Sequence, residues 1–217
     1  MTAHLHNALL LCAAIAAASP CAALAQVNAC GIVTSNPDGH YGPFDYRYER
    51  DGKLRTVEKN HFTPQVEALI RGVSGYIYSE LNYVLRSSPN HHRALIALVR
   101  YAARLKTSKI KGMEYSVECW LERALRFAPD DTVARALYAR YLGTVDRKPE
   151  GIATLDAGLR YTAENPIASY NFGLIYLELG DAERALKQAH SAISSGHTAT
   201  HLAAELKRTG KWREPHQ

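Results

Sequence analysis

Residues 166–196 read PIASYNFGLIYLELGDAERALKQAHSAISSG, and this stretch decides the fold. It contains two helical segments separated by Gly180 and Asp181. Glycine suits the left-handed residue that ends a helix, and aspartate suits the cap that starts the next one. Asn165 and Pro166 provide a matching start signal, with a cap residue directly before a proline at the first helical position. The stretch therefore predicts a pair of helices joined by a short turn.

Small and aromatic residues occur along both segments of this pair. Gly173, Ala185 and Ala192 leave room for the two helices to approach closely. Phe172 and Tyr176 are large enough to fill the space beside them. We therefore expect the two helix backbones to come nearest to each other at Gly173.

The same punctuation recurs towards the N-terminus. Thr63-Pro64 repeats the cap-and-proline start, and Pro89, Pro129 and Pro166 lie 40 and 37 residues apart. Repeats of this length built from two helices are typical of solenoid proteins. The expected helices span residues 64–71, 75–87, 91–105, 113–127, 131–143, 149–161, 166–179, 181–195 and 198–209.

The helix pair at 166–196 resembles a tetratricopeptide repeat (TPR). Phe172-Gly173 and Tyr176 match the first-helix signature of that family, and Gly180 and Ala185 match its turn and second helix. Looser copies span 132–165 and 92–129, and 198–209 is similar to the single helix that caps such arrays. The resemblance implies an all-α, TPR-like α-solenoid over residues 63–212. The segment PNHHRAL is also similar to exported bacterial repeat proteins of unassigned role.

The segment 26–62 differs from the helical part. It is rich in glycine and proline in a polar context, which predicts a mostly irregular N-terminal arm. Within it, residues 44–57 alternate aromatic and polar side chains around Asp51-Gly52, a pattern that predicts a β-hairpin. Such a hairpin is only marginally stable alone, so we expect it to lie on the helical body.

Residues 1–25 are predicted to be a signal peptide. An apolar run at 7–18 precedes Ala23-Leu24-Ala25, a small-x-small cleavage site, although no Lys or Arg stands before the run. The alternative is a buried N-terminal helix. Cleavage after Ala25 predicts a periplasmic or secreted protein, and no later stretch approaches the length of a membrane span.

Cysteine usage changes after cleavage of the signal peptide. Cys12 and Cys21 leave with the signal peptide, whereas Cys30 and Cys119 remain. Two cysteines in an oxidising compartment favour one disulfide, and the alternative is two unpaired, buried thiols.

The sequence lacks several common catalytic motifs. The chain has no HExxH, no GxxxxGK[ST] and no CxxC, and Tyr76 stands where a nucleophile elbow requires its last glycine. We therefore expect a protein that is not an enzyme and that needs no cofactor. The chain has 10 histidines, and His190, His197 and His201 are weak candidates for a metal site. Tyr101, Tyr138, Tyr141 and Tyr176 are expected to pack between helices rather than to bind a ligand.

The expected function is binding of another polypeptide. Resemblance to TPR proteins implies that first helices line a concave groove for extended peptides or helices. Arg93, Arg100 and Arg140 fall on that side, with Tyr170 and Asn171 near it on the third first helix. Arginines favour carboxylates, so an acidic peptide or a free C-terminus is the expected ligand. The net charge of +5 is spread along the chain, which does not favour nucleic acid. The alternative is a periplasmic metal- or small-ligand-binding protein that uses the histidines.

Overall fold

The computed structural model describes residues 30–33, 41–49 and 52–215, so the predicted signal peptide at 1–25 lies outside the described residues. Within the described residues the regular structure is entirely helical, as expected. None of these helices has the length and apolar composition needed to cross a membrane. The helices are α2 (Lys53–His61), α3 (Pro64–Glu67), α4 (Ile77–Ser87), α5 (His92–Leu105), α6 (Val117–Phe127), α7 (Thr132–Thr144), α8 (Lys148–Asp156), α9 (Pro166–Leu179), α10 (Ala182–Ser194) and α11 (Thr200–Arg208), with a 3₁₀ turn at Leu159–Tyr161.

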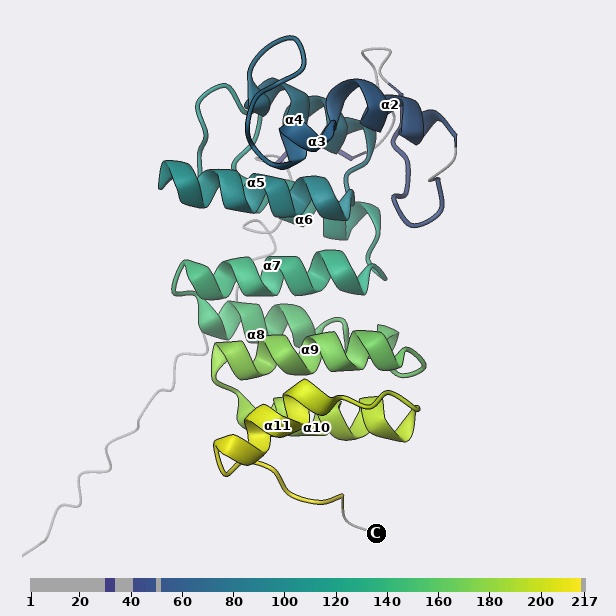
Figure 1. Cartoon of the computed structure of the whole chain (residues 1–217), viewed down its shortest axis with the longest axis vertical. Coiled ribbons are helices and arrows are strands. Elements are labelled where there is room, and N and C mark those ends of the chain that lie inside the picture. Colours follow the sequence, from purple (N-terminus) through teal and green to yellow (C-terminus); the bar gives the residue numbers. More distant parts are fainter. Residues whose placement is uncertain (1–29, 34–40, 50–51, 216–217) are drawn as a thin grey trace, which may run out of the picture.

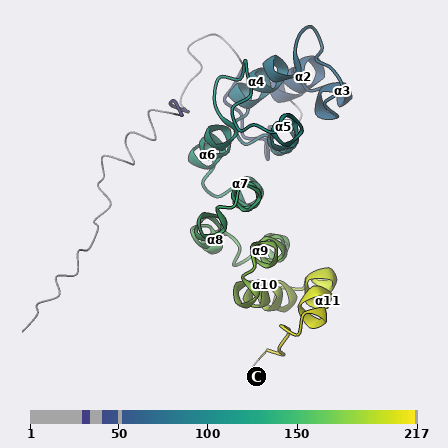
Figure 2. The same cartoon turned by 90° about the vertical axis from the view of Figure 1, so that its left-hand side faces the viewer.

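The helices stack in chain order along one long axis (Figure 1). Each helix from α4 to α11 contacts the next one along the chain, and α5, α7 and α9 also contact one another in succession. Viewed from the side, α5, α7 and α9 form one layer and α6, α8 and α10 form a second (Figure 2). At the two ends, α3 and α11 stand out beyond the first layer on the side away from the second (Figure 2).

The caps predicted from the sequence are present. Thr63, Asn165 and Asp181 each accept a backbone N–H from the first turn of the helix that follows. Gly180 ends α9 in the left-handed conformation, with φ of 93°. Asp131 caps α7, whereas its neighbour Asp130 forms an ion pair with Arg47. Local capping therefore sets the helix boundaries across most of the stack.

Three helices are at least four residues shorter than expected. The helix expected at 113–127 begins at Val117, because Ser116 caps it by accepting the backbone N–H of Cys119. The helix expected at 64–71 ends at Glu67, because Leu69 adopts a left-handed conformation with φ of 58°. The helix expected at 149–161 ends at Asp156. There Arg135 Nη1 donates a hydrogen bond to the carbonyl of Thr154, and this bond competes with continuation of the helix.

The hairpin expected at 44–57 is wrong where the structure describes it. Lys53–His61 is helix α2, and Leu54 and Val57 are buried on one face of it. The spacing of three between these two residues fits a helix rather than a strand. Upstream, Phe44 donates its backbone N–H to the carbonyl of Ser87 rather than to a second strand. Residues 50–51 lie outside the described residues.

The interior is packed mainly with aliphatic and aromatic side chains. Tyr138 and Tyr141 are buried and Tyr101 packs against the same core, while Tyr176 is buried in the C-terminal core, so all four pack between helices. The backbones of α9 and α10 approach closely at Gly173, and those of α7 and α8 approach more closely at Gly151. A β-carbon on Gly173 would lie 3.4 Å from the nearest backbone atom of α10, whereas one on Gly151 would lie 2.8 Å from the carbonyl oxygen of Ala139.

Candidate functional site

Helices α5, α7 and α9 are the first helices of the three helix pairs. Their residues can be aligned by distance from the N-cap. Their caps His91, Asp131 and Asn165 each accept the backbone N–H of a buried alanine three residues later. Because the helices are parallel and cap identically, residues at equal distances from the cap face the same direction. Three rows of side chains lie away from these alanines, at the second, fifth and ninth positions after the cap. We call them the first-helix face: Arg93, Val133 and Ile167; Ile96, Ala136 and Tyr170; and Arg100, Arg140 and Leu174.

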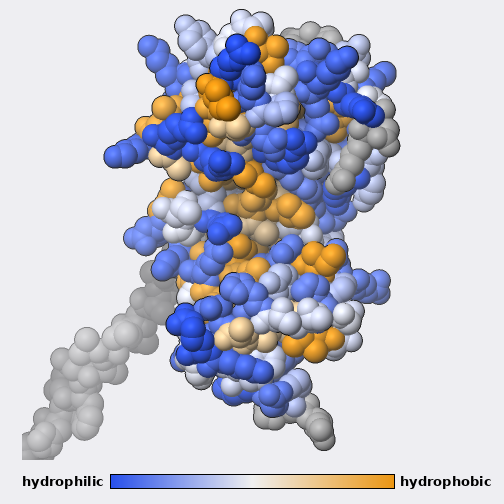
Figure 3. Space-filling view, in the orientation of Figure 1, coloured by the Kyte–Doolittle hydropathy of each residue, from blue (hydrophilic) through white to orange (hydrophobic). Residues whose placement is uncertain are grey.

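Apolar side chains on this face are more exposed than core residues. Val133 and Ile96 are each 39% exposed, and Ile167 is 62% exposed. In the space-filling view, which shows this side of the molecule, hydrophobic surface is visible in the middle of the stack (Figure 3). The cationic side chains come from α5 and α7, whereas α9 contributes an isoleucine, a tyrosine and a leucine. The face therefore changes from cationic at α5 to apolar at α9.

Two of the three expected arginines are already paired. Arg93 forms an ion pair with Glu67 of α3, and Arg140 Nε lies 2.9 Å from a carboxylate oxygen of Glu178 on α9. Arg100 is exposed and interacts electrostatically with Glu67. The positive wall expected from the sequence is therefore reduced to a smaller cationic area at α5.

Tyr170 and Asn171 lie on different sides of α9. Tyr170 lies on the face, with its ring stacked on His197 at 4.5 Å between centroids. Asn171 is half-buried and one position further along the helix, in the row that holds the buried Ala97 of α5. Asn171 therefore belongs to the packed side of α9 more than to the exposed face.

A hollow of about 400 Å³ lies between the C-terminal halves of α5 and α7. Its lining includes the buried Ala102 and Tyr141. Val99 and Val145 add further apolar surface, and Lys106 is the only charged residue in the lining. No local sequence pattern marks this hollow, because its walls come from helices about 40 residues apart in the chain.

The candidate metal-binding histidines make other contacts. His190 Nε2 lies 2.9 Å from the carbonyl oxygen of Arg213 and packs against Trp212, while His197 Nδ1 accepts the backbone N–H of Ala199. His201 is exposed. Among the residues that the structure describes, no three His, Cys, Asp or Glu side chains are grouped so that they could hold a metal ion.

A buried polar network joins the N-terminal arm to two inter-helix turns, and sequence reasoning missed it. Asn90 donates hydrogen bonds to both Asp45 and Asp131, at 2.8 Å each. His92 Nε2 lies 2.7 Å from a carboxylate oxygen of Asp131. Arg47 pairs with Asp45 and with Asp130. The only sequence signal for this network is the similarity of Pro89-Asn90 and Pro129-Asp130.

His91 is fully buried beside this network and has a defined tautomer. Its Nδ1 accepts the backbone N–H of Ala94, so its Nε2 bears the proton and donates to Glu58 at 3.0 Å. Burial lowers the pKa of His91, although the hydrogen bond with Glu58 opposes that shift. The same hydrogen bond lowers the pKa of Glu58.

The neighbouring carboxylates also favour their charged forms. Burial raises the pKa of Asp45, but hydrogen bonds from Arg47 and Asn90 outweigh it and lower the pKa to about 2. Burial likewise opposes ionisation of Asp131, and its hydrogen bonds with His92, Ala134 and Asn90 leave its pKa below the ordinary value.

Acidification is expected to destabilise the fold in two stages. His91 has a folded pKa below its unfolded value near 6.5, so its neutral form contributes stability that is lost as the pH falls below about 6. The carboxylates have folded pKa values below their unfolded values near 4, so their contribution is lost as the pH falls from about 4 towards 2. Urea unfolding at a series of pH values measures the free energy of unfolding.

Asp45→Asn should reduce the loss of unfolding free energy in the second stage and leave the first stage unchanged. Glu164→Gln, at an exposed position, is the matched control and should leave both stages unchanged. A free energy of unfolding that rises on acidification would contradict this reading of the network.

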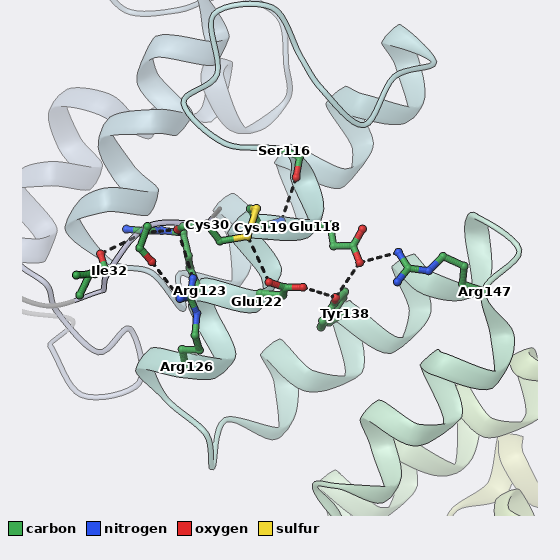
Figure 4. The surroundings of a disulfide bond; sticks show 11 residues. Cys30, Ile32, Ser116, Glu118, Cys119, Glu122, Arg123, Arg126, Tyr138 and Arg147 are labelled. Atoms are coloured by element: carbon green, nitrogen blue, oxygen red, sulfur yellow. Dashed lines mark hydrogen bonds and ion pairs between the residues drawn. A yellow bond between two sulfur atoms is a disulfide. The ribbon is translucent and has the colours of Figure 1, made fainter. Parts of the chain in front are cut away.

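A disulfide and two arginines attach residues 30–33 to α6 (Figure 4). Cys30 and Cys119 are bonded, so the alternative of two unpaired thiols is wrong. The buried Arg123 donates to the carbonyls of Cys30 and Ile32, and Arg126 donates to those of Gly31 and Cys30. The arm is therefore held by a covalent bond and by charge-assisted hydrogen bonds to its backbone.

A chain of polar contacts continues from the disulfide to α7 and the turn after it. Glu122 approaches Cys30 Sγ to 3.3 Å, and the hydroxyl of Tyr138 donates to Glu118 and Glu122. Arg147 then pairs with Glu118 at 2.6 Å (Figure 4). Burial and the two carboxylates raise the pKa of Tyr138, so its hydroxyl keeps its proton and donates.

The chain matches no family model, no curated protein and no solved structure.

Proposed function

We propose that this chain is an exported, tetratricopeptide-type interaction module that binds a segment of another polypeptide across its first-helix face. The observation that supports it most is the shared register of α5, α7 and α9, which aligns exposed apolar and cationic side chains over three successive helices. A segment lying across these helices would cover all three rows at once. The helix pairs at 92–129, 132–165 and 166–196 support the repeat assignment.

The composition of the face favours binding over catalysis. Its rows consist of arginines, aliphatic residues and one tyrosine. These side chains hold a partner by burial of apolar area and by ion pairs with carboxylates. Because Arg93 and Arg140 are paired within the chain, the proposed ligand is more apolar than the acidic peptide expected from the sequence.

Export is part of the same proposal. The Cys30–Cys119 disulfide supports it, because disulfides persist mainly in oxidising compartments such as the periplasm. The apolar run at 7–18 and the small residues at 23–25 support it from the sequence.

The proposed face is tested by reversing its apolar character. Val133→Glu combined with Ile167→Glu should weaken capture of a partner from the cell envelope by roughly tenfold or more, because each glutamate would be buried unpaired in the complex. Quantitative pull-down followed by titration of the captured partner measures the effect.

Ile193→Glu is the matched control, since Ile193 is 40% exposed on α10 in the second layer. All variants should keep their stability within about 0.5 kcal/mol, because the positions are exposed. Equal binding by the double variant and the wild type would refute the assignment of the face.

A further inference from the structure

The hollow between α5 and α7 combines an apolar floor with unpaired positive charge. Its floor includes Ala102 and Tyr141, each 6% exposed, and Thr144 and Val145 line its α7 side. A volume of about 400 Å³ falls within the range of about 300–1,000 Å³ that is usual for ligand sites. The hollow is therefore large enough to take a bulky apolar side chain.

The charge beside the hollow comes from the C-terminal half of α5. Lys106 lines the hollow, whereas Arg100 of the same helix lies outside its lining. Arg100 interacts electrostatically with Glu67, and Arg104 donates to the carbonyl of Leu69. Lys106 is therefore the cation in the described lining of the hollow, and its side chain forms no ion pair within the described residues.

The residue at the end of α5 differs from the one at the end of α9. Lys106 ends α5 in the left-handed conformation, with φ of 52° and ψ of 42°. The equivalent helix end of α9 has Gly180 in that conformation, which is the residue it favours. A lysine therefore occupies a position whose left-handed conformation glycine adopts more readily, and the lysine side chain lines the hollow.

We infer that this hollow is the anchor site for the partner: it takes one large apolar side chain whose neighbour within about two residues is an aspartate or glutamate. The apolar side chain is buried against Ala102 and Tyr141, and the carboxylate pairs with Lys106. This charge complementarity selects an acidic neighbour over a basic one. The inference rests on the proposed function and adds to it the residue pair that the partner must contain.

The test uses the whole chain and a display library of random peptides of about a dozen residues, flanked on both sides so that no free chain end contributes. We expect enriched peptides to share a large apolar residue next to Asp or Glu. One enriched peptide, synthesised with an amidated C-terminus, then serves as the probe for fluorescence anisotropy.

Two variants probe the hollow without disturbing the core. Lys106→Gly removes the charge, and glycine suits the left-handed backbone. It should weaken binding of the probe by about threefold to tenfold and reduce the salt dependence of binding. Thr144→Phe, at an exposed lining residue, fills the hollow and should weaken the probe by roughly tenfold or more. Lys111→Ala, in the loop that follows, is the matched control and should bind like the wild type.

The failures of the two proposals are distinguishable. Probe binding that is lost in Val133→Glu with Ile167→Glu but unchanged in Lys106→Gly and Thr144→Phe overturns the anchor site and leaves the proposed face standing. A library from which no peptide is enriched counts against both. A dimer of this chain that dissociates in Thr144→Phe would assign the hollow to a second copy and overturn the inference.

Discussion

Replacing Cys30 and Cys119 together with serine should lower the free energy of unfolding by about 2–5 kcal/mol. The bond joins residues 89 positions apart, and a cross-link over so long a segment removes much conformational freedom from the unfolded chain. The variant should also loosen residues 30–33, because Arg123 and Arg126 would then hold their carbonyls without covalent help. Urea unfolding of the oxidised proteins measures the change.

Reduction of the wild type provides the control for this experiment. Dithiothreitol should lower the stability of the wild type to that of the double variant, and it should leave the double variant unchanged. If the double variant and the oxidised wild type unfold at the same urea concentration, the disulfide does not anchor the arm in solution.

Gly173→Leu should destabilise the C-terminal pair of helices by about 1–3 kcal/mol or more. A β-carbon at Gly173 would lie 2.4 Å from Leu202 Cδ2 and 3.2 Å from Gln188 Cβ, so a leucine would push α10 and α11 away from α9. Thermal or urea unfolding monitored by circular dichroism measures the loss.

Lys187→Leu is the matched control, because it adds the same side chain at an exposed position of the facing helix α10. It should change stability by less than about 0.5 kcal/mol. If the Gly173→Leu and Lys187→Leu proteins have the same melting temperature, the packing of α9 described above is wrong.

Local signals predicted the helical part of the chain well. Asn165-Pro166 and Gly180-Asp181 mark helix ends through hydrogen bonds that form within a few residues, so their effect can be read from short stretches. Thr63 acts in the same way. The all-α class followed from these signals and from the helical spacing between them.

Pairings between distant residues could not be predicted from spacing. Arg93 pairs with Glu67, which lies 26 residues earlier in the chain. Arg140 pairs with Glu178 on α9. Both arginines looked free for a ligand because their partners are fixed only by the stacking of helices. The network around Asp131 and the hollow near Lys106 depend on the same stacking.

The arm shows where an alternating pattern misled. Residues 44–48 alternate aromatic and polar side chains, but their backbone groups find partners at the end of α4 and in the turn after it. Tyr46 donates its N–H to Asn90 and Phe44 donates to Ser87, so no second strand is needed. Alternation predicts a half-buried extended segment; it does not identify the surface on which that segment lies.

Site-specific photo-crosslinking in the native cell tests the central claim most directly. A photoreactive amino acid would be placed singly at Ile96, Val133 and Ile167 on the first-helix face, and at Ile193 and Lys187 on α10. The account predicts that the three face positions cross-link to the same polypeptide and that the two α10 positions do not. Cross-links from Ile193 or Lys187 to that polypeptide, with none from the face, would contradict it.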